Sequence, residues 1–311
     1  MQPKSLAWKY EWRAKIGGSR SAAAAGVHEY MTPLQLYKSM VDGVEFDPEE
    51  SPDMLRGILL ESIALQRLQM LYADLSFEPH DQDRFVYNDK YPFASDLPDG
   101  WVAHDGARIP VQIKVPRPEN WRKLDEHIPA YIQCNCIHSC ALNNSPAILL
   151  ACLNPVTMEV YRNVYEPAQD VTQALMDAEE RFFTEHVIPR VPPPPRTAGD
   201  MRMLWPEHAP GKRVTATDDI AYAHAKLLTL KPEAKERIDR IENLTLMIKA
   251  FMGDAEILID ERGQLLATWR STIVNALDGK QFRNELPHVY ARYTKDRPQR
   301  TFLPKKPKEV I

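Results

Sequence analysis

Apolar and polar positions alternate most regularly in the stretch PDGWVAHDGARIPVQIKVP, residues 98–116. Asp105-Gly106 is a strong signal for a two-residue hairpin turn, and pairing outward from this turn places Asp99 opposite Gln112. Side chains alternate between the two faces of a strand, so Asp99, Gln112 and Lys114 share one face. The opposite face collects apolar residues that suit a packed core: Val102, Val111, Ile113 and Val115. The pattern therefore predicts a hairpin that holds three polar side chains above a buried face.

The polar trio has two interpretations at this point. Half-exposed strands commonly carry polar residues on the face that meets water, which would make the trio structural. Pro110 adds a second question, because proline inside a strand indicates an edge position or a bulge that would shift this register.

A helical pattern precedes the hairpin. Residues 51–53, Ser-Pro-Asp, have the composition of an N-cap and a first helical turn. Apolar residues then recur at helical spacing: Met54, Ile58, Leu65, Leu68 and Tyr72. Glu61 falls inside this stripe, where a carboxylate needs a partner. Neither Arg56 nor Arg67 lies three or four residues away, so a basic residue from another element and a metal ion are both open. Taken with the hairpin trio, metal ligation accounts better for Glu61.

The remaining pattern predicts the architecture of the first 190 residues. Helix-like and strand-like stretches alternate, which indicates an α/β core with a mixed central β-sheet flanked by helices. After the hairpin we expect a helix from Pro129 to Leu142, strands over 147–152 and 156–165, and a helix over 171–187.

A proline run, VPPPPRTAGD at 191–200, favours an extended segment and predicts a semi-rigid linker. Residues 201–311 then form a smaller module, mostly helical. Its expected elements are a helical stretch over 216–252 broken at Pro232, a hairpin over 256–270 and a short helix around 280–295. We expect this module to contact a partner or to flank DNA.

Composition narrows the class of protein. The 311 residues are 44% hydrophobic and 26% charged, with a net charge of −4, as in ordinary globular proteins. This charge means that any nucleic-acid site has to be a local one. We find no apolar run of transmembrane length and no signal peptide, so we expect no membrane association and a cytoplasmic location.

The four cysteines lie at 134, 136, 140 and 152, and the run CNCIHSC suggests a metal site. On a helix, however, Cys134 and His138 share one face while Cys136 and Cys140 share another, so the four cannot readily surround one ion. Buried free thiols are the better interpretation.

Several short motifs, taken in order, resemble one family. They are WRAKIGGSRSAAAAG with TPLQLY, RGILLE at 56–61, PFASDLPDG leading to QIK, and AYIQCN at 130–135 before the helix that ends FFTEHV. This set resembles the YqaJ-type phage recombination exonucleases, the family of phage lambda exonuclease, within the PD-(D/E)xK nuclease superfamily. The resemblance covers roughly residues 1–190 and implies a restriction-endonuclease-like core there.

The resemblance also implies roles for individual residues. Glu61, Asp99, Gln112 and the backbone carbonyl of Ile113 correspond to the metal site, and Lys114 to the lysine that orients the attacking water. Gln133, with Tyr131 beside it, corresponds to a supporting glutamine. Arg13 and Ser19, with Tyr131, correspond to residues that hold a DNA 5′-phosphate. Gly17-Gly18-Ser19 could direct backbone N–H groups at an anion or could simply cap a helix.

The implied activity is that of a Mg²⁺-dependent deoxyribonuclease, with Mn²⁺ able to substitute, that degrades linear double-stranded DNA from 5′ ends in homologous recombination. The family further implies a phage or prophage origin, a bacterial or phage-infected cell, a homotrimer and a single-strand-annealing partner. An endonuclease of the same fold, and an interaction scaffold with no role on DNA, stay open.

Gln112 departs from the family pattern, because an acid is usual at this position. A glutamine can offer a carbonyl oxygen to Mg²⁺ but brings no negative charge. Three explanations are open: a natural variant that works with a neutral ligand, an engineered change from Glu, or a protein that binds DNA ends without cutting them.

Overall fold

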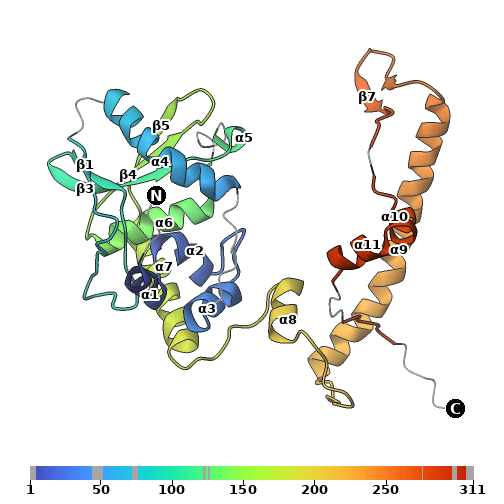
Figure 1. Cartoon of the computed structure of the whole chain (residues 1–311), viewed down its shortest axis with the longest axis horizontal. Coiled ribbons are helices and arrows are strands. Elements are labelled where there is room, and N and C mark those ends of the chain that lie inside the picture. Colours follow the sequence, from blue (N-terminus) through green and yellow to red (C-terminus); the bar gives the residue numbers. More distant parts are fainter. Residues whose placement is uncertain are drawn as a thin grey trace. The chain divides into compact units, whose positions relative to one another are not determined.

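The computed structural model describes residues 5–43, 52–71, 76–121, 124, 127–274, 276–295 and 300–305 (Figure 1). The expected N-cap Ser51 and the apolar Tyr72 lie outside these residues. The chain divides into two compact units, residues 1–204 and 205–311, and each is described by itself.

A five-stranded sheet forms the centre of the first unit. Its strands are β1 (Glu78–Pro79), β2 (Gly100–His104), β3 (Ala107–Lys114), β4 (Ile148–Leu153) and β5 (Val160–Tyr165), and they lie in this order across the sheet. The β3–β4 pair is parallel and the other three pairs are antiparallel. The expectation of a mixed sheet flanked by helices is confirmed.

The hairpin has the predicted register. His104 pairs with Ala107, and the pairing continues to Gly100 opposite Val111. Asp105 and Gly106 form the turn with φ of 46° and 78°, the left-handed values that a two-residue turn of this kind requires. Pro110 pairs only with Trp101 of β2, because the parallel pairing of β3 with β4 begins one residue later. The proline therefore leaves the register intact.

Helices cover both faces of this sheet (Figure 1). On one face α4 (Pro52–Leu71) packs Ala64 and Leu68 against the alternate residues of β3 that include Val111 and Ile113. On the other face α6 (Ala130–Leu142) packs Ile132, Cys136 and Cys140 against β4. All four cysteines are buried free thiols, as the sequence predicted. The polar residues of β3 thus lie on the α6 face.

A second part of the core joins the N-terminal helices to α6. Its buried residues come mainly from α2 (Gly18–Ala24), α3 (Pro33–Val41), α6 and α7 (Gln169–Phe182), and a π-helical turn, Phe183–Val187, packs against them. The first helix, α1 (Leu6–Ala14), has no buried residue. Ile16, Leu34, Leu36 and Met176 are among its fully buried residues. A short helix, α5 (Pro118–Trp121), follows β3.

The proline-rich segment expected as a linker packs against the first unit. Arg196 donates from Nη1 to the carbonyl of Gly26 at 2.6 Å. Asp200, in α8 (Ala198–Leu204), is 1% exposed and accepts a hydrogen bond of 2.7 Å from Oγ1 of Thr32. Side-chain anchors that are distant in sequence hold the segment, and the boundary between the units falls after residue 204.

The second unit contains α9 (Asp218–Met252), a hairpin of β6 (Ile257–Ile259) and β7 (Leu265–Thr268), α10 (Gly279–Glu285) and α11 (Pro287–Tyr293). The hairpin is confirmed. The expected break at Pro232 is wrong, since α9 continues through it. A proline removes one helical hydrogen bond, and here the turns on both sides stay helical. The single helix expected around 280–295 is divided, because Pro287 begins a separate one. Across the described residues, no helix combines the length and apolar character that a membrane crossing requires.

Candidate functional site

Asp99 is held against the end of the hairpin by three hydrogen bonds. Its Oδ2 accepts from Nε2 of Gln112 at 2.7 Å and from the backbone N–H of Ile113 at 2.5 Å. Its own backbone N–H donates to the carbonyl of Val111 at 2.9 Å. The predicted meeting of Asp99 and Gln112 is therefore present, and the carboxylate has a fixed orientation.

Burial and nearby charged side chains shift the pKa of Asp99. Burial is the largest cause and raises this pKa to about 7. The ammonium of Lys114 opposes the shift, the Glu61 carboxylate adds to it, and the N–H of Ile113 opposes it. Glu61 of α4 and Lys114 of β3 thus lie within electrostatic reach of Asp99. The two carboxylates and the lysine that the sequence singled out thus come from α4, from the residue before β2 and from β3.

Gln112 meets Asp99 through its amide nitrogen. The side chain is 7% exposed, so it has little access to water. A glutamate here would place a second carboxylate against Oδ2, whereas the glutamine donates a hydrogen bond to it. Because Oδ2 already accepts two hydrogen bonds, a cation bound by Asp99 would use Oδ1.

The available donors suit a hard divalent cation. Glu61 and Asp99 provide carboxylate oxygens, and the backbone of Ile113 provides a carbonyl, which are the ligand types that Mg²⁺ prefers. Within the described residues, no three His, Cys, Asp or Glu side chains are grouped to hold a metal. Two carboxylates would therefore need a carbonyl, the Gln112 amide oxygen or water to complete the coordination. These metal-binding roles stay predictions.

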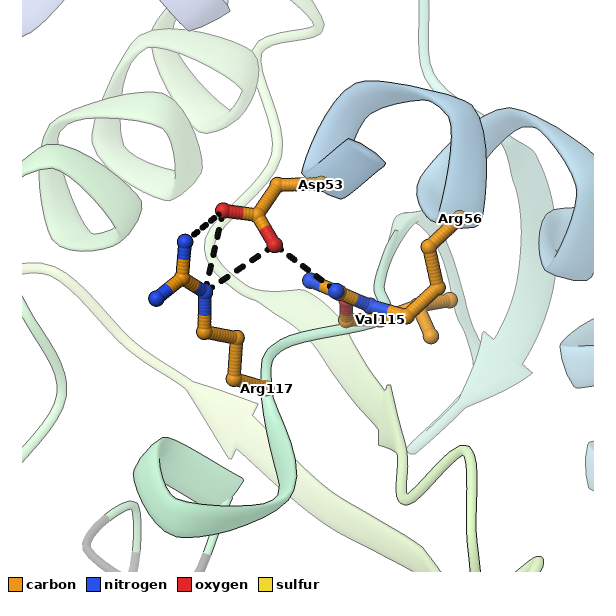
Figure 2. A network of polar contacts seen from close by, with 4 residues as sticks. All are labelled: Asp53, Arg56, Val115 and Arg117. Atoms are coloured by element: carbon orange, nitrogen blue, oxygen red, sulfur yellow. Dashed lines mark hydrogen bonds and ion pairs between the residues drawn. The ribbon is translucent and has the colours of Figure 1, made fainter. Parts of the chain in front are cut away.

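An ionic cluster ties the start of α4 to the end of β3 (Figure 2). Asp53 accepts from Nη1 of Arg56 at 2.7 Å and from Nε of Arg117 at 3.0 Å. Arg56 also donates from Nε to the carbonyl of Val115 at 3.3 Å, directly after Lys114. The hydrogen bonds from Arg117 and Arg56 lower the pKa of Asp53 to about 2. The helix that carries Glu61 is thus fastened to the strand end that carries Lys114, a link that sequence analysis missed.

Helix α6 holds the segment that leads to Asp99. Asp96 is buried and accepts from Oγ of Ser139 at 2.6 Å and from Nδ2 of Asn143 at 2.8 Å. One residue earlier, the carbonyl of Ser95 lies 3.0 Å from Nε2 of His138. Both anchors are polar residues within or next to the cysteine-rich run. Their function in the fold is to position this segment.

His138 also forms a buried ion pair with Glu179 of α7. The distance between Nδ1 and Oε1 is 2.9 Å, and both side chains are 0% exposed. Burial alone would lower the pKa of His138, but the charge and hydrogen bond of Glu179 outweigh it and raise the pKa to about 9. The imidazole is therefore protonated at neutral pH and donates from both ring nitrogens. Glu179 also accepts from Oγ of Ser21 at 2.6 Å, which joins α2, α6 and α7.

The residues predicted to hold a 5′-phosphate lie on three helices. Arg13 is partly buried in the last turn of α1, and Ser19 is exposed in the first turn of α2. Arg20 is 2% exposed and connects these helices, since it stacks on Trp12 at 3.9 Å and donates to backbone carbonyls of Trp12 and Lys15. Sequence analysis did not single out Arg20. The phosphate-binding roles of Arg13 and Ser19 stay predictions.

Tyr131 and Gln133 occupy the N-terminal part of α6. The ring of Tyr131 lies 5.5 Å from that of His28 and 6.0 Å from that of Tyr30. Gln133 donates from Nε2 to the carbonyl of Ile128 at 2.6 Å. Their proposed roles beside the metal site are untested by these contacts.

The site lies inside a segment that matches a known protein family. Residues 7–145, which run from α1 to just past α6 and include every site residue predicted from the sequence, match the YqaJ-like viral recombinase domain. This stretch is therefore similar to the YqaJ-like viral recombinase domain. The resemblance expected from the motifs is confirmed.

One curated relative covers almost the whole chain. The uncharacterized protein YqaJ of Bacillus subtilis (strain 168) is 22% identical in an alignment of 306 positions that covers 95% of this chain and 92% of that protein. The similarity to this relative therefore extends over both units of the chain.

Two solved structures are similar at lower coverage. An alkaline exonuclease from Laribacter hongkongensis has a TM-score of 0.45 and 16% identity, over 58% of this chain and 92% of that one. A phage-related exonuclease from Haemophilus somnus 129PT has a TM-score of 0.41 and 10% identity, over 57% of this chain and 96% of that one.

Proposed function

We propose that this chain is a metal-dependent deoxyribonuclease that degrades linear double-stranded DNA from its 5′ ends during homologous recombination. The YqaJ-like viral recombinase domain supports the place in recombination. The observation that carries the proposal is the Asp99 carboxylate, which is fixed by β3 and lies within reach of the charges of Glu61 and Lys114.

The donor set fits Mg²⁺, for which Mn²⁺ would substitute. Glu61, Asp99 through Oδ1, and the carbonyl of Ile113 would hold the ion, and the amide oxygen of Gln112 could add a fourth ligand. When bound, the ion supplies an activated water and offsets negative charge on the phosphate.

The side chains around the proposed metal ion have separate roles in hydrolysis and DNA binding. The Lys114 ammonium, a compact charge beside Asp99, orients the water and attracts a phosphoryl oxygen. The Gln112 amide keeps the Asp99 carboxylate in one orientation. Arg13 and Ser19 bind the 5′-terminal phosphate, with Tyr131 and Gln133 supporting the site from α6.

The proposal extends to assembly and location. We infer that the enzyme works on DNA ends in the cytoplasm of a bacterial or phage-infected cell. A homotrimer and a single-strand-annealing protein are the proposed partners, and residues 201–311 are the proposed interaction or DNA-flanking module.

A second candidate follows from Gln112. Because this residue brings no charge where the family has an acid, a protein that binds DNA ends without cutting them is the main alternative. An endonuclease built on the same site is a further one.

A digestion time course separates these candidates. Linear and closed circular duplex DNA are incubated with the purified chain in Mg²⁺ or Mn²⁺. The exonuclease proposal predicts loss of linear DNA alone, abolished in Asp99→Ala and Lys114→Ala. Cutting of the closed circle would identify an endonuclease. If the chain and its Gln112→Glu variant bind DNA ends but leave them intact, the end-binding alternative replaces the proposal.

A further inference from the structure

A cavity of about 280 Å³ opens beside the N-terminal part of α6. Its lining comes from Leu124, His127 and Ile128, from Gln133 of α6 and from residues of β5. Strand β5 is the last strand of the sheet, so this cavity lies at a sheet edge. It was not part of the site expected from the sequence, apart from Gln133.

Three residues of β5 line this cavity, namely Tyr161, Asn163 and Tyr165. They are spaced by two, which places all three on one face of the strand. Tyr161 and Tyr165 are both half-buried and pack at the margin of the core beneath α6. The strand therefore presents two aromatic rings with an amide between them, and we call this the β5 cavity.

The sheet register relates the β5 cavity to Asp99. Lys114 pairs with Cys152 of β4, and Cys152 pairs with Tyr161. Directly paired residues project to the same side of a sheet, so the lining tyrosines share a face with Lys114. Two strand spacings separate the Lys114 and Tyr161 positions, roughly 10 Å. A stacked strand advances roughly 3.4 Å per nucleotide, so the cavity lies about three nucleotides from a phosphate held at Lys114, which is within electrostatic reach of Asp99.

The lining chemistry matches an unpaired nucleobase. Aromatic side chains stack on the flat face of any base, and this contact is typical of proteins that hold single strands. The amides of Asn163 and Gln133 and the ring of His127 add hydrogen-bonding groups around the edge. Ligand pockets commonly measure roughly 300–1,000 Å³. The β5 cavity lies just below this range, a size for one base rather than for a base pair.

We propose that the β5 cavity binds one unpaired nucleobase of the DNA strand whose phosphate lies at Asp99, with Tyr161 and Tyr165 as the stacking residues. This inference rests on the proposed nuclease function. The cavity would add a substrate preference that the metal site alone does not give. It would favour a strand that has been separated from its complement over an intact duplex end.

Binding without hydrolysis tests the cavity separately from the nuclease activity. The full chain is titrated in EDTA with two duplexes that carry a three-nucleotide 5′ tail, one with normal bases and one with abasic sites in the tail. The proposal predicts that the abasic tail binds roughly tenfold more weakly. It also predicts that 2-aminopurine at one tail position shows quenched fluorescence when bound.

Substitutions assign the effect to the cavity. Tyr161→Leu and Tyr165→Leu are expected to bind both tails equally, while Tyr161→Phe keeps the ring and the preference for the normal tail. Tyr87→Leu, at an exposed tyrosine of the first unit outside both sites, is the matched control and is expected to behave as the unchanged chain. Equal binding of both tails by the unchanged chain, or a preference that survives both leucine substitutions, overturns the proposal.

A mononucleotide distinguishes the two sources of a base. If dAMP binds in a Tyr161-dependent manner while the two tails bind equally, the cavity takes free nucleotides and the assignment to a DNA strand is overturned. If the tail preference is present but linear DNA survives in Mg²⁺, the β5 cavity stands and the proposed nuclease function fails.

Discussion

The Gln112 amide donates a hydrogen bond of 2.7 Å to Oδ2 of Asp99. This contact places a neutral donor where a second acid would repel the buried carboxylate, and it explains how the site stays ordered with only two carboxylates. Because the glutamine is neutral, the site also has less negative charge with which to attract a cation.

Gln112→Glu is expected to tighten divalent cation binding and to destabilise the cation-free protein. The added charge attracts Mg²⁺ or Mn²⁺, while in EDTA two buried carboxylates face each other, at a cost of about 1–3 kcal/mol. Calorimetric titration with Mn²⁺ and unfolding in EDTA measure both effects. Gln66→Glu, on an exposed part of α4, adds the same charge outside the site and should change neither. Unchanged Mn²⁺ affinity in Gln112→Glu would contradict the assignment of residue 112 to the metal site.

Loss of the ionic cluster at the start of α4 is expected to slow DNA hydrolysis more than it weakens DNA binding. Asp53→Asn removes the charge that joins Arg56 and Arg117, so Glu61 is held less firmly toward Lys114. Separate measurement of kcat and KM on linear DNA checks this, with kcat expected to fall several-fold. Asp42→Asn breaks another exposed ion pair, with Lys38, and serves as the control. An effect on KM alone would show that the cluster contacts DNA and does not position α4.

The His138–Glu179 pair is expected to make stability fall in alkaline solution. The pKa of His138 is raised from 6.5 to about 9 in the folded chain, so the native state binds the proton more tightly than the unfolded state. Its contribution is complete below about pH 6.5 and is lost as the pH rises through about 9. Urea unfolding at pH 7 and pH 10 measures the loss.

The same experiment on variants assigns this pH dependence. His138→Gln should remove most of the difference between pH 7 and pH 10, and should cost about 3–5 kcal/mol at pH 7 because Glu179 stays buried without its cation. His208→Gln changes an exposed histidine and should leave the profile as it was. A His138→Gln profile equal to that of the unchanged chain would mean that another group causes the alkaline loss.

Local rules predicted the hairpin and the meeting of Asp99 with Gln112, because a turn of two residues fixes which positions pair. They also singled out Glu61, since helical periodicity alone shows that this acid stands at a position where the stripe is otherwise apolar. The strand that carries Pro110 kept its register because its pairing with β4 begins only at Val111. That relation depends on β4, which begins at Ile148, and no local pattern contains it.

The contacts that hold the site in place could not be predicted from the sequence either, because they join residues that lie far apart in the chain. Arg117 meets Asp53 across 64 positions, and Glu179 meets His138 across 41. The anchoring of the proline-rich segment depends on Thr32 and Gly26, which are more distant still. Composition identified that segment as extended, which gives no information about the surface on which it packs.

The central claim is that a divalent cation binds between Glu61 and Asp99, and crystals soaked in Mn²⁺ test it most directly. Anomalous diffraction locates the ion independently of activity. The account predicts one anomalous peak in contact with carboxylate oxygens of Glu61 and Asp99, absent from Asp99→Ala crystals. Fully soaked crystals with no such peak, or with manganese bound only elsewhere, would contradict it.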